Sequence, residues 1–80
     1  MVVETFKPVD RINHVKDLCA KQKPPMDKKT FVDEVGYATK ISRPTLEKVY
    51  NGATQLDYDV IEKLAWFFNV GTEDVLESKL

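Results

Sequence analysis

Residues 32–52 constrain the fold of this 80-residue chain more than any other segment, because they predict two short helices joined by a tight turn. In the second helix, Val49 and Tyr50 follow Leu46 by three and four positions, so the three side chains form one apolar face. In the first helix, Gly36 is small enough for a neighbouring helix to cross closely. The segment therefore predicts two helices that pack against each other at an angle.

The face of the second helix opposite to the apolar one is polar, with Arg43, Thr45 and Lys48 on it. Ile41 lies in the connection, where its side chain can fill the angle between the helices. A short helix with an apolar back and a basic front, braced by a second helix, is how a helix-turn-helix motif presents side chains to the DNA major groove. The segment therefore indicates a DNA-binding motif.

The chain resembles the lambda-repressor-like, or Xre/Cro, helix-turn-helix family over about residues 12 to 77. In the motif, the small residue of the first helix is Gly36 and the hydrophobic residue after the turn is Ile41. The recognition helix begins with Ser42-Arg43-Pro44-Thr45-Leu46 and ends with Asn51-Gly52. The closing helices contain the matching pairs Leu64-Ala65 and Asn69-Val70. The resemblance implies an all-α, five-helix domain that binds double-stranded DNA sequence-specifically and regulates transcription, as a possible homodimer.

Three positions depart from the pattern of the family. Lys40 stands where the family commonly has glycine, and a left-handed conformation costs a non-glycine residue about 1–2 kcal/mol. Either Lys40 bears this strain or the turn has a different shape. Val32 replaces a glutamine that contacts phosphate in many members, and the link at residues 23–29 is longer than the usual turn.

The first eight residues are predicted to form an arm or a short strand, and residues 9–80 the helix-turn-helix domain. A first helix is predicted over residues 9–22, because Pro8 suits a helix entry and Pro24 and Pro25 stop a helix. The buried stripe expected on this helix consists of Ile12, Val15, Leu18 and Cys19.

The second helix has two possible N-caps. Asp27 can cap it, or Thr30 can, with Asp33 completing a Thr-x-x-Asp capping box. The last short helix is predicted over residues 72–77 with Thr72 as its cap.

Another helix is predicted over residues 57–69, with Asp57 as its cap. Val60, Trp66 and Phe67 lie outside its expected core face. They either pack within the chain or form a homodimer interface, since large aromatic side chains outside a core face often mark association surfaces. The core face consists of Ile61, Leu64, Ala65 and Phe68.

The predicted base contacts come from the recognition helix. Arg43 and Lys48 can donate hydrogen bonds to O6 and N7 of guanine. Thr45 can contact a thymine methyl group or a phosphate, and Pro44 offers apolar contact only. The alternative is that these side chains are solvated charges on a protein-binding module.

The predicted phosphate contacts are Lys28, Lys29 and the hydroxyl group of Thr30, because helix N-termini approach phosphates. Solvated loop lysines explain the same pair equally well. Asn51 either contacts the DNA backbone or caps the recognition helix.

Charge is distributed unevenly along the chain. The net charge of −1 argues against a non-specific nucleic-acid binder. Residues 28–48 hold five basic and three acidic side chains, whereas residues 49–80 hold two basic and six acidic ones. The positive end therefore coincides with the motif, an asymmetry that a sequence-specific DNA binder can use.

An enzyme is not expected from this sequence. His14 and Cys19 are separated by about 140° around a helix, so they cannot form a dyad or share a metal ion. No cofactor, metal site or membrane partner is expected, and the absence of a long apolar run and of a signal peptide favours a cytoplasmic protein. The alternative function is a protein-interaction module on the same fold, an antitoxin or repressor modulator with a protein partner.

Overall fold

The computed structural model describes residues 11–78, which form five helices and a small two-stranded sheet. The predicted all-α, five-helix domain is thus confirmed, with a short sheet added to it. The predicted N-terminal arm lies outside the described residues. Along the chain the elements are β1 (Arg11–Asn13), α1 (Val15–Ala20), a second helix made of α2 (Lys28–Thr30), the π-helical turn η2 (Phe31–Val35) and α3 (Gly36–Thr39), then α4 (Arg43–Tyr50), α5 (Tyr58–Phe68), α6 (Thr72–Val75) and β2 (Leu76–Ser78).

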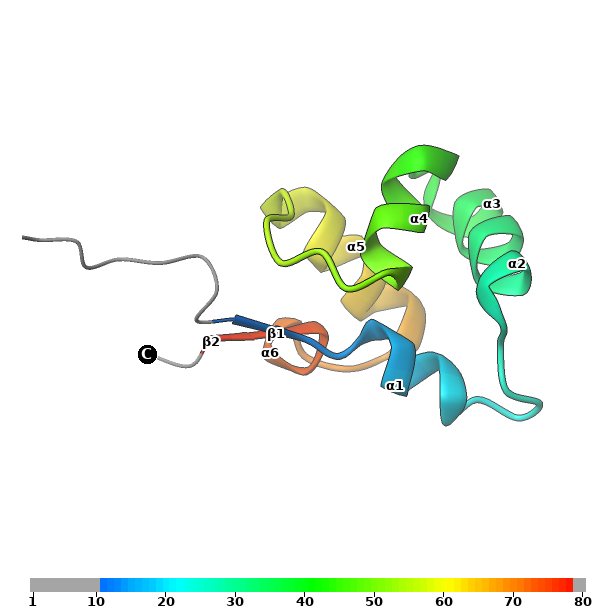
Figure 1. Ribbon diagram of the computed structural model, residues 1–80, viewed down its shortest axis with the longest axis horizontal. Coiled ribbons are helices and arrows are strands. Elements are labelled where there is room, and N and C mark those ends of the chain that lie inside the picture. The colour runs from blue at the N-terminus through cyan, green and yellow to red at the C-terminus, as the bar shows by residue number, and fades with distance from the viewer. Residues whose placement is uncertain (1–10, 79–80) are drawn as a thin grey trace, which may run out of the picture.

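The recognition helix of the motif, α4, lies between the α2–α3 helix and α5 in Figure 1. Phe31 lies where these helices meet. Its ring stacks on Phe68 of α5 at a centroid distance of 6.3 Å and contacts Tyr50 of α4 at 5.7 Å. The core is therefore centred on the second helix, and the buried side of α4 packs against that helix.

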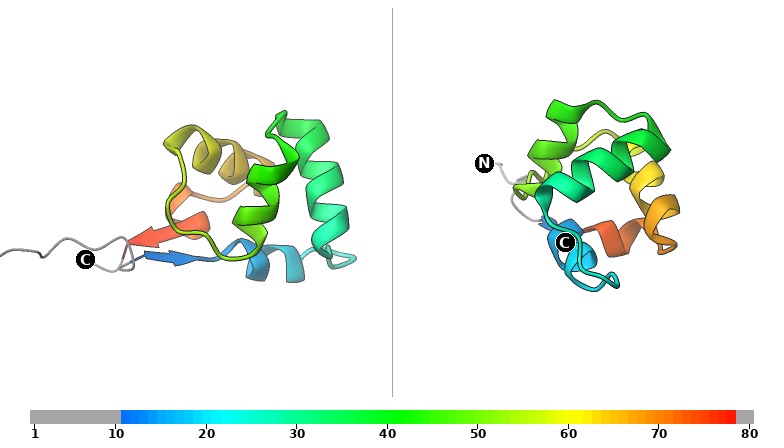
Figure 2. Two further views of the ribbon diagram at one scale, coloured as in Figure 1. Left: turned by 45° about the horizontal axis from the view of Figure 1, so that its top comes forward. Right: turned by 90° about the vertical axis from the view of Figure 1, so that its right-hand side faces the viewer.

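The prediction of a helix over residues 9–22 is wrong at its start. Residues 11–13 form strand β1, which pairs antiparallel with β2 so that Ile12 lies opposite Glu77. Figure 2 shows the two strands side by side, projecting beyond the helices. Ile12, expected in the buried stripe, is 37% exposed, whereas Val15 and Cys19 are fully buried.

Local hydrogen bonds explain why the helix begins late. The side-chain oxygen Oδ1 of Asn13 accepts the N–H of Val15 at 2.8 Å, and the backbone N–H of His14 donates to the carbonyl of Val75 at 2.9 Å. Asparagine readily forms such local bonds in place of a helix. The backbone at residues 11–14 is therefore bonded to the C-terminal segment.

The structure shows which residues cap the helices at their N-termini. Asp27 caps the second helix, because its carboxylate accepts the N–H of Thr30 at 2.8 Å. Asp57 precedes α5 as predicted, although its side chain makes no capping bond with the described residues. Thr72 was wrongly predicted as the last cap. Gly71 holds that position, and its N–H donates to the Asp74 carboxylate at 3.2 Å.

The core face predicted for α5 is confirmed. Val60 and Phe67 are partly buried and pack against this core, whereas Trp66 is 70% exposed. The buried residues of α5 are Ile61, Leu64, Ala65 and Phe68.

Candidate nucleic-acid interface

The close crossing predicted at Gly36 is confirmed. A Cβ atom built there would lie 3.3 Å from Cδ1 of Leu46, so a larger residue would require the Leu46 side chain to shift. Ile41 is buried in the angle between the two helices, as predicted. These contacts fix the orientation of α4.

The turn between the helices keeps the left-handed conformation in spite of its lysine. Lys40 has φ 64° and ψ 17° and ends α3, so it bears the strain that glycine would avoid. Its ammonium group lies 5.2 Å from the ring centre of Tyr37, close enough for a cation–π interaction. Of the two alternatives, the structure therefore shows the strained lysine and not a turn of different shape.

Lys40→Gly is expected to leave the free energy of unfolding unchanged or to raise it by up to about 1 kcal/mol. Relief of backbone strain stabilises the variant, while greater unfolded-state entropy and loss of the Tyr37 contact oppose the gain. Lys40→Ala removes the same contact but keeps a Cβ atom. Chemical denaturation should therefore find the glycine variant more stable than the alanine variant, and the reverse order would contradict a strained turn.

The recognition helix turns its basic face outward. Its back is formed by Leu46 and Val49, which are fully buried. Its outer side chains are Arg43, Pro44 and Lys48, which are exposed, and Thr45, which is half-buried and hydrogen bonded to the Ser42 hydroxyl group at 2.8 Å. The four predicted base-contact residues therefore lie on or beside one surface.

A carboxylate joins the two groups of predicted DNA contacts. Asp33 of η2 accepts a hydrogen bond from Nη2 of Arg43 at 2.7 Å and one from Nζ of Lys29 at 3.1 Å. The Arg43 hydrogen bond, followed by that of Lys29, holds the pKa of the Asp33 carboxyl below its ordinary value. Asp33 was predicted only as part of a capping box.

The predicted phosphate contacts lie around the start of the second helix. Lys28 and Lys29 are exposed there and Thr30 is half-buried. The Asp27 carboxylate occupies the Thr30 N–H, which lowers the pKa of that carboxyl. Because this acid competes with phosphate for the helix end, the two lysines are better candidates than Thr30. Asn51 is exposed at the end of α4 and has a helical φ of −78°.

The family of Cro/C1-type helix-turn-helix DNA-binding domains matches residues 12–79 of the chain. The chain belongs to this family. A comparison with curated proteins and a comparison with solved structures found no significant match. The match extends from β1 beyond β2, so it includes the recognition helix and every helix that packs against it.

In this Cro/C1-type domain, Asn13 holds the end of the recognition helix. Its side-chain Nδ2 donates to the carbonyl oxygens of Val49 at 2.9 Å and Ala53 at 2.7 Å. The helix predicted over residues 9–22 includes Asn13 and so does not predict this role, because Asn13 lies in β1. The available signal was the residue type itself, since asparagine favours side-chain to backbone bonds over helix interiors.

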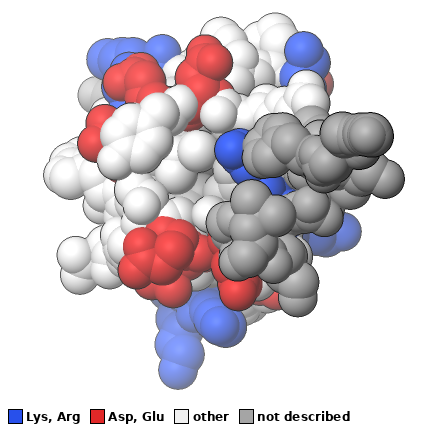
Figure 3. All heavy atoms as spheres, turned by 90° about the vertical axis from the view of Figure 1, so that its left-hand side faces the viewer, with Lys and Arg blue, Asp and Glu red and all other residues white. Residues whose placement is uncertain are grey.

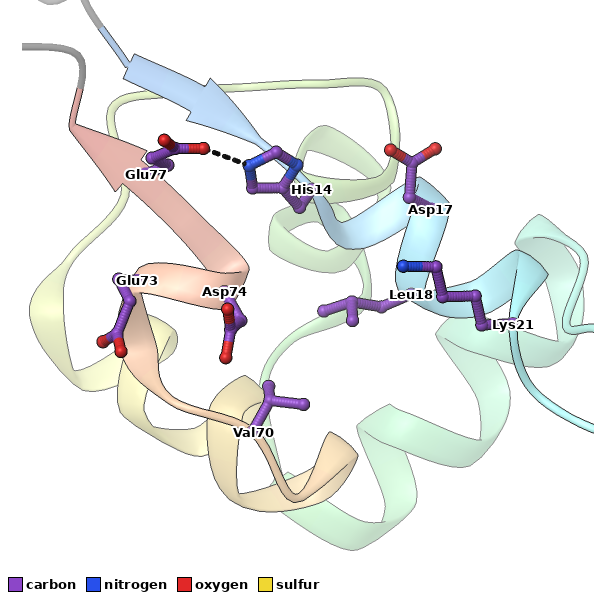
Figure 4. A pocket seen from close by; sticks show the side chains of 8 residues that line it. All are labelled: His14, Asp17, Leu18, Lys21, Val70, Glu73, Asp74 and Glu77. Atoms are coloured by element: carbon purple, nitrogen blue, oxygen red, sulfur yellow. Dashed lines mark hydrogen bonds and ion pairs between the residues drawn. The ribbon is translucent and has the colours of Figure 1, made fainter.

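A pocket of about 620 Å³ lies on another part of the domain, between α1 and the C-terminal segment. None of the residues that line it belongs to α4. Figure 4 shows His14 and Glu77 facing each other across its edge, with Nε2 and Oε1 2.8 Å apart. The pocket is lined by His14, Asp17, Leu18, Lys21, Val70, Glu73, Asp74 and Glu77.

The end of the molecule from which the strands project is mixed in charge. Figure 3 shows acidic and basic side chains there in separate small groups around a pale area, with no continuous basic surface on the visible part. The outward basic side chains of α4 are therefore the better candidates for contact with DNA.

Cys19 and His14 have separate structural roles. Burial raises the pKa of the Cys19 thiol to about 11, so it stays protonated and acts as a core residue. The Nε2 atom of His14 lies 2.8 Å from a carboxylate oxygen of Glu77.

Within residues 11–78, no three histidine, cysteine or acidic side chains are grouped to hold a metal ion. None of the helices in that range has the length and apolar character needed to cross a bilayer.

Proposed function

We propose that this domain recognises a specific sequence in double-stranded DNA, with α4 in the major groove, and regulates transcription through that binding. The observation that carries the proposal is the division of α4 into a buried back, Leu46 and Val49, and an outer face with Arg43 and Lys48 exposed. Such a helix, fixed by a second helix at Gly36, presents its first turns to base edges.

The side chains divide by chemistry into two groups of contacts. Arg43 and Lys48 donate to O6 and N7 of guanine, while Pro44 and Thr45 provide contact with a thymine methyl group. Lys28 and Lys29 bind phosphates and set the position of the domain on the duplex. Thr30 and Asn51 are further candidates for contact with phosphate, beside the two lysines.

The test is selection of bound duplexes from a random library, followed by measurement of the affinity of the enriched duplex at several salt concentrations. The proposal expects one enriched sequence and an affinity that falls as salt rises, because cations on the protein displace counterions from phosphate. If no sequence is enriched above background at low salt, sequence-specific binding is excluded.

A second candidate function is a protein-interaction module on the same fold. It is favoured by Val32, which is 4% exposed at the position where many relatives use a glutamine on phosphate. The net charge of −1 and a loop without cations at residues 53–56 favour it as well. An absence of enriched DNA, together with a protein partner bound through the α4 face, would support this function.

We further propose that the domain forms a homodimer through Trp66. The three residues predicted for this interface do not share one face of α5, because at about 100° per residue Val60 and Phe67 are about 20° apart and Trp66 is about 120° from Val60. Val60 and Phe67 pack against the core, whereas Trp66 is exposed. Trp66 is thus the residue on which a dimer depends. A two-fold pair would place its recognition helices about 34 Å apart and predict a palindromic site.

Trp66→Glu is expected to convert the dimer into a folded monomer, because a carboxylate is costly to bury in an interface. Sedimentation velocity at micromolar concentrations measures the change, and circular dichroism checks the fold. Tyr58→Glu is the matched control, since Tyr58 is an exposed aromatic residue on the same helix. A wild-type protein that stays monomeric at high micromolar concentration would remove both the dimer and the expected palindrome.

A further inference from the structure

We propose that Asp33 is a positioning residue that makes Arg43 discriminate between specific and non-specific DNA; this inference rests on the proposed function. Asp33 lies on the second helix, outside the recognition helix, and was not among the predicted DNA contacts. It acts on DNA through Arg43 and not by touching the bases itself.

The geometry ties three charged groups into one arrangement. Oδ1 of Asp33 lies 2.7 Å from Nη2 of Arg43, and Oδ2 lies 3.1 Å from Nζ of Lys29. Each carboxylate oxygen therefore has its own cationic partner. Arg43 begins α4 and Lys29 lies in α2, so the carboxylate connects a predicted base contact with a predicted phosphate contact.

The bond to Asp33 leaves Arg43 able to bind a base. A guanidinium group carries five N–H donors in a rigid fork, and the Asp33 bond uses only one of its nitrogen atoms. The Arg43 side chain is still 61% exposed. Held at one nitrogen, it keeps donors free for the paired acceptors O6 and N7 of guanine.

The same carboxylate disfavours non-specific binding. A free arginine close to a duplex can turn toward any phosphate, whereas Arg43 can turn away from the direction that Asp33 fixes only by giving up a charge-assisted bond. Asp33 also repels phosphate directly, and this repulsion is the same on every sequence. A guanine in the right position offsets this repulsion, because it accepts hydrogen bonds from the oriented Arg43. The carboxylate therefore lowers affinity for other sequences more than for the specific one.

The test compares Asp33→Asn with wild type on the selected duplex and on a scrambled duplex. We expect the ratio of the two affinities to fall about tenfold, part of the discrimination that one good bidentate base contact provides. On the scrambled duplex, the slope of log affinity against log salt should steepen by about one, because Arg43 becomes free to neutralise a phosphate.

Glu34→Gln is the matched control. Glu34 neighbours Asp33, is exposed, and makes no ion pair among the interactions found within residues 11–78. Its substitution changes the net charge by the same amount, so it should tighten both duplexes alike and keep the affinity ratio. In an Arg43→Ala background, Asp33→Asn should also leave the ratio unchanged, since the residue through which it acts is gone.

The outcomes are distinguishable. An affinity ratio that does not change in Asp33→Asn, or that changes as much in Glu34→Gln, overturns the inference while the proposed function stands. A lower melting temperature with an unchanged ratio assigns Asp33 a structural role only and also overturns it. A wild-type protein that enriches no duplex overturns both the inference and the proposed function.

Discussion

Phe31→Ala is expected to lower the free energy of unfolding by about 3–5 kcal/mol, the range for removal of a buried aromatic ring. Phe31 is fully buried and stacks on Phe68 with an angle of 8° between the rings. It also contacts Tyr50 at the end of α4. Its loss therefore opens a cavity where three helices meet. Because native proteins are stable by only about 5–15 kcal/mol, this loss removes a large share of the free energy of unfolding.

Urea denaturation followed by circular dichroism measures this effect, provided that the transition is two-state. Tyr58→Ala is the control, because Tyr58 is an aromatic residue of similar size that is exposed at the start of α5. Its removal should change the free energy of unfolding by no more than about 0.5 kcal/mol. If the two variants were equally stable, Phe31 would not be the centre of the core.

The helical faces were predictable from sequence because burial on one side of a helix leaves a period of 3.6 residues. Leu46 and Val49 in α4 follow this period, and both are fully buried. The close crossing at Gly36 was predictable for a related reason, since only a small residue lets two helix backbones approach. Length and periodicity together were sufficient to predict these helices and their inner surfaces.

The sheet was not predictable because its strands are too short to show a period. β1 and β2 have three residues each and lie more than 60 residues apart in the chain, so neither shows an alternating pattern by itself. Pairing with β2 overrides the helix that Pro8 and the following apolar residues suggested. The hydrogen bonds from the Asn13 side chain to the end of α4 were not predictable for the same reason, since Asn13 lies in β1.

The outer face of the motif was predictable only as a set of exposed cations. Sequence spacing placed Arg43 and Lys48 on the surface of α4, and both are exposed there. It did not reveal the carboxylate of Asp33 beside Arg43, because these residues are ten positions apart and meet only after the turn has folded. The DNA contacts themselves remain predictions.

Arg43→Ala is expected to weaken binding to the selected duplex by about 1–3 kcal/mol and to relax preference at one or two base pairs. Arg43 is the first residue of α4, where a recognition helix contacts base edges, and most of its side chain is exposed. Its guanidinium group can donate two parallel bonds to one guanine. Alanine can donate none, so affinity for the other bases at that position should change less.

Lys28→Ala provides the matched comparison, because it removes the same charge from the phosphate-contact group. It should weaken the selected and the scrambled duplex by similar factors and flatten the salt dependence of both, as the loss of one phosphate contact does. Fluorescence anisotropy titrations of both variants against both duplexes separate the two patterns. If Arg43→Ala lost affinity equally on both duplexes, Arg43 would be a phosphate contact, and base recognition would have to come from Lys48 and Thr45.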